Sequence, residues 1–396
     1  MQSLQTSSES ASEPDANHTA ILRRDWLLFS ISVFLFGYGF GVYSVVFLNY
    51  ITDMLGVAPV QMGVLESSRE IPGLLAVGIA GLVASFAENR VGAGSLIFSA
   101  LGVAATGYVH TFPELVAVTV FWSVFMHQWF TTSSAIPLAL SGGTRGGRHL
   151  GRMASIGAAA TILAYASVHV LVHHVSYRGF FLIAGSMILL AGLLLTPMSH
   201  LGTTKNRQRL LYRREYRLYY LLTFLEGFRR QVFTTFAIFA LVQAHHTPLD
   251  QISSMMIVNA SVTFLIGAPM GRIVDRVGER NAMAVYYAAI ALAFLGYAVT
   301  SDPGTMKVLY VLDNALFTLG VSITTYLNRI VRDNELMPSL AMGQTMNHIA
   351  AVAIPVCGGL LWYSFGYHAP FWAGVIAAAI SLIVTRFVPK KLMPAA

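Results

Sequence analysis

Charged residues are scarce in this sequence, and cysteine is almost absent. Only 11% of the 396 residues are Asp, Glu, Lys or Arg, whereas soluble globular proteins carry about 25%. The single cysteine, Cys357, excludes an internal disulfide. Apolar residues make up 55% of the chain, and the mean hydropathy is +0.63. This balance excludes an ordinary soluble protein and predicts an all-α protein that crosses a lipid bilayer many times.

The motifs of nucleotide-driven, catalytic and metal-binding proteins are also missing. No Gly-x-x-x-x-Gly-Lys loop is present, and no loop is long enough for a nucleotide-binding domain. Six histidines are expected on or near the outer face, without metal-ligand spacing or an accompanying Cys or acidic cluster. They are His110, His173, His174, His245, His246 and His368. We therefore expect no cofactor, no metal site and no enzymatic activity.

Apolar runs of membrane-spanning length recur along the whole chain. A helix needs about 20 mostly apolar residues to cross the hydrocarbon core. Twelve such runs begin near Trp26, Gln61, Gly94, Leu115, Met153, Phe180, Leu218, Ile252, Ala282, Val308, Leu340 and Phe371. The sequence therefore predicts twelve transmembrane helices.

Lys and Arg indicate how these helices are oriented. With the N-terminus in the cytoplasm, 20 of the 25 basic residues lie on the cytoplasmic side, and only Arg178 and Lys307 lie outside. Positive residues concentrate in cytoplasmic loops. We therefore place both termini in the cytoplasm and read the net charge of +7 as a sign of topology rather than of nucleic-acid binding.

The chain divides into two halves. Residues 1–22 are polar and predict a disordered cytoplasmic tail. Residues 23–198 and 218–396 each hold six predicted spans, and the basic segment 199–217 links them. A shift of 190 in the numbering aligns Gly37 with Gly227 and Gln61 with Gln251. This weak repeat predicts two pseudo-symmetric six-helix bundles, an arrangement that many transporters share.

A loop motif follows the eighth predicted span. The segment from Gly271 to Arg280 reads Gly-Arg-Ile-Val-Asp-Arg-Val-Gly-Glu-Arg. It resembles the Gly-x-x-x-Asp-Arg-x-Gly-x-Arg signature of the major facilitator superfamily (MFS). A degraded copy that includes Arg90 follows the second span. The resemblance implies that the matching residues form a gate latching the two halves on the cytoplasmic side. The predicted gate residues are Asp275, Arg276, Gly278, Arg280 and Arg90.

The resemblance also implies transport of a small solute by alternating access, with spans 1, 4, 7 and 10 lining a central cavity. The drug-antiporter members of the family usually carry Gly-x-x-x-Gly-Pro-x-x-Gly-Gly in span 5. That pattern is missing from span 5 here, and only the fragment Pro-Val-Cys-Gly-Gly at residues 355–359 appears, in span 11.

Two predicted spans carry charges near the middle of the membrane. Side chains three and four residues apart share a helical face, and a charge at the bilayer centre costs at least about 2.5–3.5 kcal/mol. The two sets lie at similar estimated depths and have net charges of opposite sign. They are Glu66, Arg69 and Glu70 in span 2, and Glu226, Arg229 and Arg230 in span 7.

We expect these two sets to form one network between the halves. Protonation of Glu66 or Glu70, or competition from a solute anion, would then free Arg229 or Arg230 and shift the halves. The alternative is a static ion-pair cluster that fixes helix packing. Further candidates lie in spans that the family uses for its cavity, although packing roles are open for them: Tyr38, Tyr43, His127, Gln128, Asp313 and Asn314. His348 in span 11 has the same two interpretations.

The sequence thus predicts a proton-coupled secondary transporter that is monomeric and lies in the cell inner (plasma) membrane. Guanidinium groups match carboxylate or phosphate with paired hydrogen bonds, which favours an anionic or zwitterionic solute. A proton-driven exporter of amphiphilic drugs is one alternative. A membrane sensor that transports nothing is another.

Overall fold

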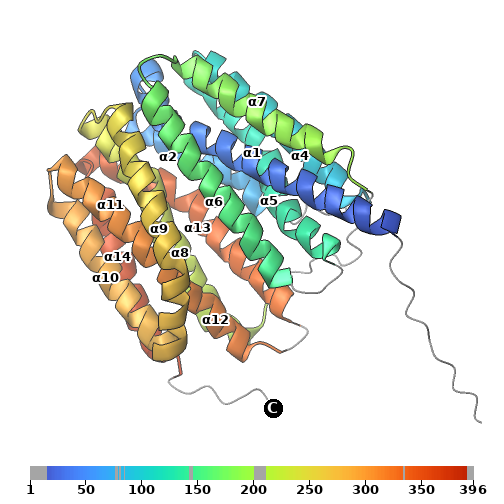
Figure 1. Cartoon of the computed structure of the whole chain (residues 1–396). Helices are drawn as coiled ribbons and strands as arrows, with labels where there is room; N and C mark the ends of the chain where they lie inside the picture. Colours follow the sequence, from blue (N-terminus) through green and yellow to red (C-terminus); the bar gives the residue numbers. More distant parts are fainter. Residues whose placement is uncertain are drawn as a thin grey trace, which may run out of the picture.

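The computed structural model places residues 16–75, 79, 82–83, 85–141, 146–199, 211–332 and 335–389. Every regular element in these ranges is helical, and the helices pack as long, roughly aligned rods (Figure 1). The N-terminal half holds α1 (Ala16–Leu55), α2 (Pro59–Leu74), α4 (Glu88–Ala105), α5 (Phe112–Leu140), α6 (Gly146–Leu171) and α7 (Tyr177–Leu195). The C-terminal half holds α8 (Arg217–Phe239), α9 (Leu249–Val277), α10 (Glu279–Val299), α11 (Pro303–Phe317), α12 (Val321–Ile330), α13 (Leu336–Phe365) and α14 (Ala369–Val384).

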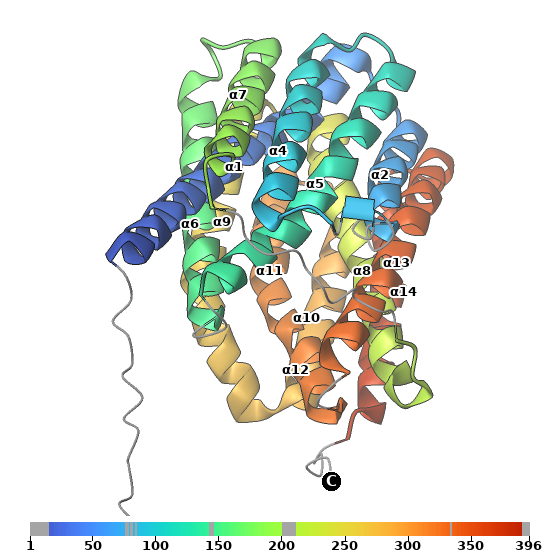
Figure 2. The ribbon, with the colours of Figure 1, turned by 90° about the vertical axis from the view of Figure 1, so that its right-hand side faces the viewer.

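Nine helical stretches of the described chain are long and apolar enough to cross a membrane. In one of them α11 continues through a 3-10 turn into α12, so the two form one interrupted helix (Figure 2). The helices α2, α5 and α8 fall outside these nine. Two of them, α2 and α8, carry the charged residues discussed above, and such residues lower the apolarity of a helix. The all-helical fold is confirmed, and the count of twelve crossings stays a prediction.

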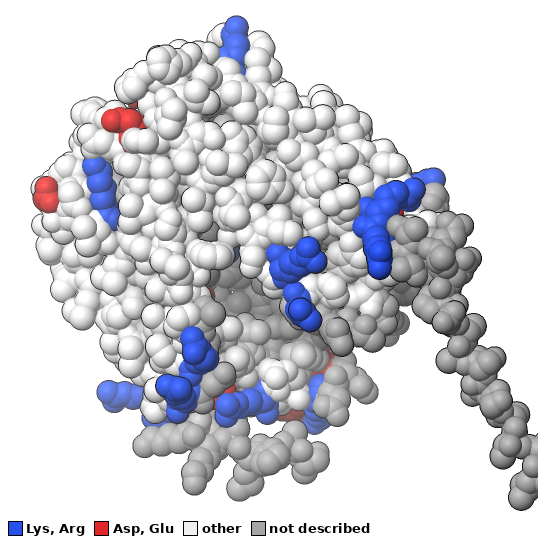
Figure 3. Space-filling model, viewed as in Figure 1, with Lys and Arg blue, Asp and Glu red and all other residues white. Residues whose placement is uncertain are grey.

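The two faces of the bundle differ in charge. We call the end at which α1 begins and α14 ends the basic face, and the end at which α1 passes into α2 the distal face. On the side of the molecule that Figure 3 shows, Lys and Arg gather toward the basic face, and few of them lie toward the distal face. Helix α1 begins at Ala16, so residues 16–22 of the expected disordered tail are helical. Residues 1–15 lie outside the described residues.

Local sequence signals set the distal turns. Thr111 caps α5, because its side chain accepts a hydrogen bond from the Glu114 backbone N–H while the Glu114 carboxylate accepts one from the Thr111 N–H. Asp302 caps α11, because its side chain accepts a hydrogen bond from the Thr305 backbone N–H, and Pro303 stands in the first turn of the helix. These turns fix where the rods end and therefore how deep their polar residues lie.

The most extensive contacts between the halves are those of α2 with α13 and of α6 with α9. At Gly63 of α2 an added side-chain carbon would collide with the backbone oxygen of Pro355 on α13. At Gly359 of α13 it would lie 2.5 Å from the backbone oxygen of Pro59. Only glycine permits such close backbone approach. The α2–α13 seam is therefore tight at the distal end.

Hydrogen bonds close the distal face as well. The buried Asn49 side chain at the end of α1 donates to the Thr247 carbonyl oxygen at 3.0 Å. His169 of α6 lies 3.0 Å from the Asp250 carbonyl oxygen and 3.2 Å from the Ser253 hydroxyl, both on α9. The two halves are therefore in contact near the distal face.

The last part of the expected linker, residues 211–217, is tied to the start of α13 at the basic face. Glu335 accepts hydrogen bonds from Arg213 and, at 2.7 Å, from the Tyr216 hydroxyl. The start of α8 is thereby fixed to the start of α13. Residues 200–210 of the linker lie outside the described residues.

Candidate functional site

The charged residues of α2 form a compact cluster. Arg69 lies 2.6 Å from a Glu66 carboxylate oxygen, one turn away, and 3.2 Å from the Oε1 atom of Glu70. Both carboxylates are buried, whereas the Arg69 side chain is 27% exposed. The i,i+3 spacing predicted this shared face, and the structure brings the three side chains together.

A second cluster lies inside the C-terminal half. Arg229 on α8 is 1% exposed and pairs with Glu226 at 2.8 Å and with Asp313 on α11 at 2.9 Å. The Tyr286 hydroxyl on α10 donates to the same Glu226 oxygen at 2.8 Å. One arginine and two carboxylates are therefore enclosed among three helices of one half.

The expected direct network between α2 and α8 is wrong in its central contact. Arg229 turns away from the seam because its ion pairs lie within the C-terminal half. Arg230 instead donates to the Asn347 side chain on α13 at 2.9 Å. Neighbouring helical residues point about 100° apart, so the two arginines reach different partners. Among the described residues, no ion pair joins Glu66 or Glu70 to α8.

Helix α13 makes the polar connection between the halves instead. Its Asn347 receives the hydrogen bond from Arg230, and the next residue, His348, places Nδ1 3.3 Å from the Oε2 atom of Glu70. Sequence reasoning gave His348 little weight and missed Asn347 and Tyr286. The signal for Asn347 and His348 was that they form a polar pair inside the apolar span 11, the helix that packs on the charged span 2.

His127 on α5 completes this region. Its Nδ1 lies 2.9 Å from the Ser123 carbonyl oxygen and 3.2 Å from the Ser123 hydroxyl. That hydroxyl donates to the Arg69 carbonyl oxygen at 2.6 Å. The His127 and His348 rings are 5.5 Å apart, centroid to centroid. Residues of α2, α5 and α13 thus converge at one level of the seam.

The other predicted site residues are more dispersed. Tyr43 is buried among aromatic rings, with Trp122 5.2 Å and Phe47 5.0 Å away between ring centroids. Tyr38 packs at the edge of the core. Asn314 donates to a backbone oxygen of its own helix. Gln128 is buried on α5. Tyr43 and Tyr38 have the surroundings of packing residues.

An aromatic cavity of about 320 Å³ lies among α1, α5 and α6 in the N-terminal half. Phe36, Phe40, Trp129 and Phe130 line it, together with hydroxyl groups from Ser133, Ser134 and Thr161. The Phe130 ring lies 6.3 Å from the His127 ring. The cavity therefore adjoins the polar seam and has room for an apolar or ring-bearing group.

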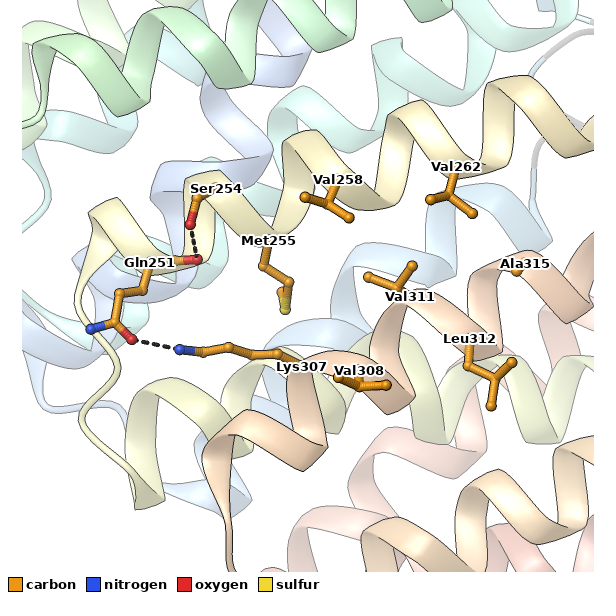
Figure 4. A pocket seen from close by; sticks show the side chains of 10 residues that line it. All are labelled: Gln251, Ser254, Met255, Val258, Val262, Lys307, Val308, Val311, Leu312 and Ala315. Carbon is orange, nitrogen blue, oxygen red and sulfur yellow. Dashed lines mark hydrogen bonds between the residues drawn. The ribbon is translucent and has the colours of Figure 1, made fainter.

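A larger groove of about 560 Å³ runs between α9 and α11 (Figure 4). Its walls are mostly Val, Leu and Met side chains, and at one end the Lys307 ammonium donates to the Gln251 side chain. Val258, Val308 and Leu312 in this groove are exposed. An exposed apolar groove on a helix surface of this chain has the character of a lipid-facing surface, so we do not place the solute there.

Comparison with known proteins identifies the family. The sequence matches the model of the Major Facilitator Superfamily over residues 29–217 and 219–395. The chain belongs to this superfamily. This membership and the apolar helices support a multi-pass membrane transport protein. No curated protein sequence matches the chain significantly.

Solved structures of MFS transporters share the fold. The nucleoside transporter NupG has 14% sequence identity and a TM-score of 0.76, covering 93% of this chain and 99% of that chain. The inward open xylose transporter XylE from E. coli has 16% identity and a TM-score of 0.71, covering 93% and 97%. A bacterial homologue of the iron transporter ferroportin has 13% identity and a TM-score of 0.73, covering 93% and 99%. At these identities the likeness shows the fold alone.

The MFS signature covers the last turns of α9, Gly278 and the first two residues of α10. Gly278 separates the two helices with φ +79°, a conformation that favours glycine. The next residue, Glu279, is buried and pairs with Arg329 on α12 at 2.7 Å. The side chain of Asp275 lies outside the described residues. The predicted gate role of Asp275, Arg276, Gly278, Arg280 and Arg90 stays a prediction.

Proposed function

We propose that the protein is a secondary active transporter that moves a small anionic or zwitterionic solute by alternating access and couples this movement to protons. Family membership supports transport. We further propose that it acts as a monomer in the cell inner (plasma) membrane with both termini in the cytoplasm, as the distribution of basic residues indicates.

The surroundings of Arg230 are the observation on which the proposed choice of solute rests. This arginine lies at the seam, half-buried, and among the described residues its side chain has one hydrogen bond, to the neutral Asn347. Its Nε atom is buried without a partner. Arg69 and Arg229, by contrast, are each held by two carboxylates. Among the described residues no ion pair holds Arg230, and an interior cation in that state is costly, so a solute carboxylate or phosphate is favoured beside it.

The rest of the solute would extend toward the aromatic cavity. Phe130 borders that cavity and also contacts His127 at the seam. Aromatic faces bind ring systems and apolar groups, and the hydroxyl groups of Ser133, Ser134 and Thr161 provide hydrogen bonds. These neighbours favour a solute that combines an anionic group with an apolar or cyclic part.

The enclosed cluster of the C-terminal half is our proposed proton site. With both carboxylates ionised, Glu226, Arg229 and Asp313 carry a net charge of −1 in an enclosed interior. One oxygen of each acid, Oε2 of Glu226 and Oδ2 of Asp313, is buried without a hydrogen-bond partner. One proton taken up by the cluster balances this charge. This replaces the expectation that Glu66 or Glu70 releases the arginines of α8.

Two measurements test the proposal. A thermal-shift screen of anionic and zwitterionic solutes on the purified protein identifies ligands, and proteoliposome flux with a pH gradient then measures transport. We expect Arg230→Gln to abolish binding of the hits. We expect Asp313→Asn to keep solute exchange but lose proton-driven accumulation, whereas Asp302→Asn, at an exposed helix cap, behaves as wild type. Absence of flux under every gradient would support the sensor instead.

The aromatic cavity also gives the exporter alternative a physical basis, because amphiphilic drugs bind to such surfaces. That alternative predicts that Arg230→Gln has little effect on transport. It also predicts that loss of the protein sensitises cells to varied cationic dyes. Binding of one narrow class of anions, dependent on Arg230, would contradict it.

A further inference from the structure

Three residues with metal-ligating side chains meet at the seam, each from a different helix. They are Glu70 on α2, His127 on α5 and His348 on α13, and one ligand atom of each lies within 4.8 Å of the other two. Two of these helices belong to the N-terminal half and one to the C-terminal half. Side chains from both halves therefore converge on one point.

The hydrogen bonds of His127 leave a lone pair free for a ligand. Its Nδ1 faces the Ser123 carbonyl oxygen, and the Ser123 hydroxyl proton goes to the Arg69 carbonyl oxygen. Both neighbours of Nδ1 thus act as acceptors, which places the proton on Nδ1 and the lone pair on Nε2. A backbone carbonyl that holds the remote nitrogen in this way is the usual support of a metal-bound histidine.

Gly73 lets the two histidine rings pack directly against α2. A side-chain carbon built there would lie 2.5 Å from the His127 Nε2 atom and 2.5 Å from the His348 Cε1 atom. The Nδ1 atom of His348 is buried and has no hydrogen-bond partner, although Glu70 Oε2 lies 3.3 Å away. The two rings thus meet at Gly73, where α2 carries no side chain, and one ligand atom of each lies near a carboxylate oxygen of Glu70.

We propose that Glu70, His127 and His348 bind a divalent transition-metal ion, with Zn²⁺ the best match. Zinc takes two imidazole nitrogens and one carboxylate oxygen at about 2.0–2.2 Å and leaves a fourth position for water. Imidazole ligands select zinc and its transition-metal neighbours over magnesium and calcium. The ligand atoms must approach by about 1 Å to reach such bond lengths, which side-chain rotation provides.

The surrounding charges set the strength of the site. Arg69 occupies the other oxygen of Glu70, Oε1, and is also held by Glu66. Arg230 lies close by, since it bonds to the residue next to His348. Two nearby guanidinium groups oppose a cation, so we expect an ion that a chelator removes. Because its ligands come from both halves, the bound ion stabilises the arrangement in which α2 and α13 meet.

Metal binding to the purified full chain tests this site and does not depend on which solute is transported. After treatment with a chelator, equilibrium dialysis against Zn²⁺ should give one ion per chain for wild type and for His173→Ala, an exposed control. His127→Ala and His348→Ala should bind at least about tenfold more weakly. Zn²⁺ should raise the melting temperature of wild type and leave that of His348→Ala unchanged.

Two further variants keep the test decisive if an alanine variant does not fold. His348→Gln retains side-chain volume and polarity, and Gly73→Ala keeps all three ligands but places a methyl group between the rings. Both should lose the ion. The proposal is overturned if wild type binds no Zn²⁺, or if these variants bind it as tightly as wild type does, since surface histidines would then be responsible.

Discussion

Replacing Arg229 by Gln should strongly destabilise the C-terminal half. The side chain is 1% exposed and is the cation that balances Glu226 and Asp313. Removing one partner of a buried ion pair costs about 3–5 kcal/mol, because a buried charge is left without compensation. Here two carboxylates lose their shared partner at once. At roughly 2–4 °C per kcal/mol for a domain of 150–250 residues, the melting temperature should fall by about 6–20 °C.

Melting of the detergent-purified protein near pH 7.5, in the absence of solute, measures this effect. Arg230→Gln is the matched control, because it removes the neighbouring arginine, whose partner is the neutral Asn347. We expect a much smaller change for that variant. Adding Asp313→Asn to Arg229→Gln should restore part of the loss. Adding Glu226→Gln as well should restore more, since a neutral cluster leaves no unpaired charge.

The double-mutant comparison separates charge balance from packing. If charge imbalance causes the loss, the effects of Arg229→Gln and Asp313→Asn are strongly non-additive. Equal melting temperatures for Arg229→Gln and Arg230→Gln, or no recovery in the double variant, would refute the reasoning. The loss would then reflect the shape of the arginine side chain rather than its charge.

Three further outcomes follow from contacts near the two faces. Hydrogen bonds from Tyr216, and to a lesser extent from Arg213, hold the pKa of Glu335 below its ordinary value. The ionised Glu335 carboxylate therefore stabilises the folded state at pH values above its ordinary pKa. This stabilisation is lost as the pH falls through the lowered pKa. Melting curves from about pH 5 to pH 3 should therefore show a steeper decline for wild type than for Glu335→Gln. Gly63→Ala should cost about 1–3 kcal/mol in a melting assay, because the new methyl group meets the α13 backbone. Asn49→Ala removes a buried hydrogen bond between the halves, which should cost about 1–3 kcal/mol of stability. Hydrogen exchange in residues 240–249 should become faster. Unchanged exchange would contradict a role of Asn49 in holding the halves together.

Local sequence patterns predicted the rods and the contacts within one helix. The i,i+3 spacing correctly paired Glu66 with Arg69 and Glu226 with Arg229. The partner of Arg229 on α11, Asp313, is 84 residues away, and its choice depends on how α8, α10 and α11 rotate against one another. Hydropathy and spacing carry no information on that rotation. The expected network failed at this step.

The sequence did not predict that α13 connects the two halves, for a related reason. Asn347 and His348 are two polar residues in a long apolar run, and neither belongs to a charge pattern. Their meaning comes from the seam, where α2 and α13 approach closely through glycines such as Gly63 and Gly359. A polar pair on the helix that packs against a charged span is a signal that sequence analysis can use. Its partners still require the three-dimensional arrangement.

Asn347 competes with the proposed solute for Arg230, and this competition makes a last prediction. A solute anion that takes the arginine must break the hydrogen bond of 2.9 Å to Asn347. A hydrogen bond to a charged group contributes about 1.5–3 kcal/mol. Asn347→Leu, which keeps a similar volume, should therefore raise the affinity for the anionic ligand by about tenfold or more.

Transport should respond in the opposite direction. Asn347 and His348 are adjacent on α13, so movement of that helix changes the contacts with Arg230 and Glu70 together. In Asn347→Leu the solute no longer alters the α8–α13 contact when it binds, and tighter binding should then accompany slower flux. Calorimetry with a hit from the ligand screen measures this affinity. An unchanged affinity would show that Arg230 binds the solute while it keeps its hydrogen bond to Asn347. Solute binding would then not change the contact between α8 and α13.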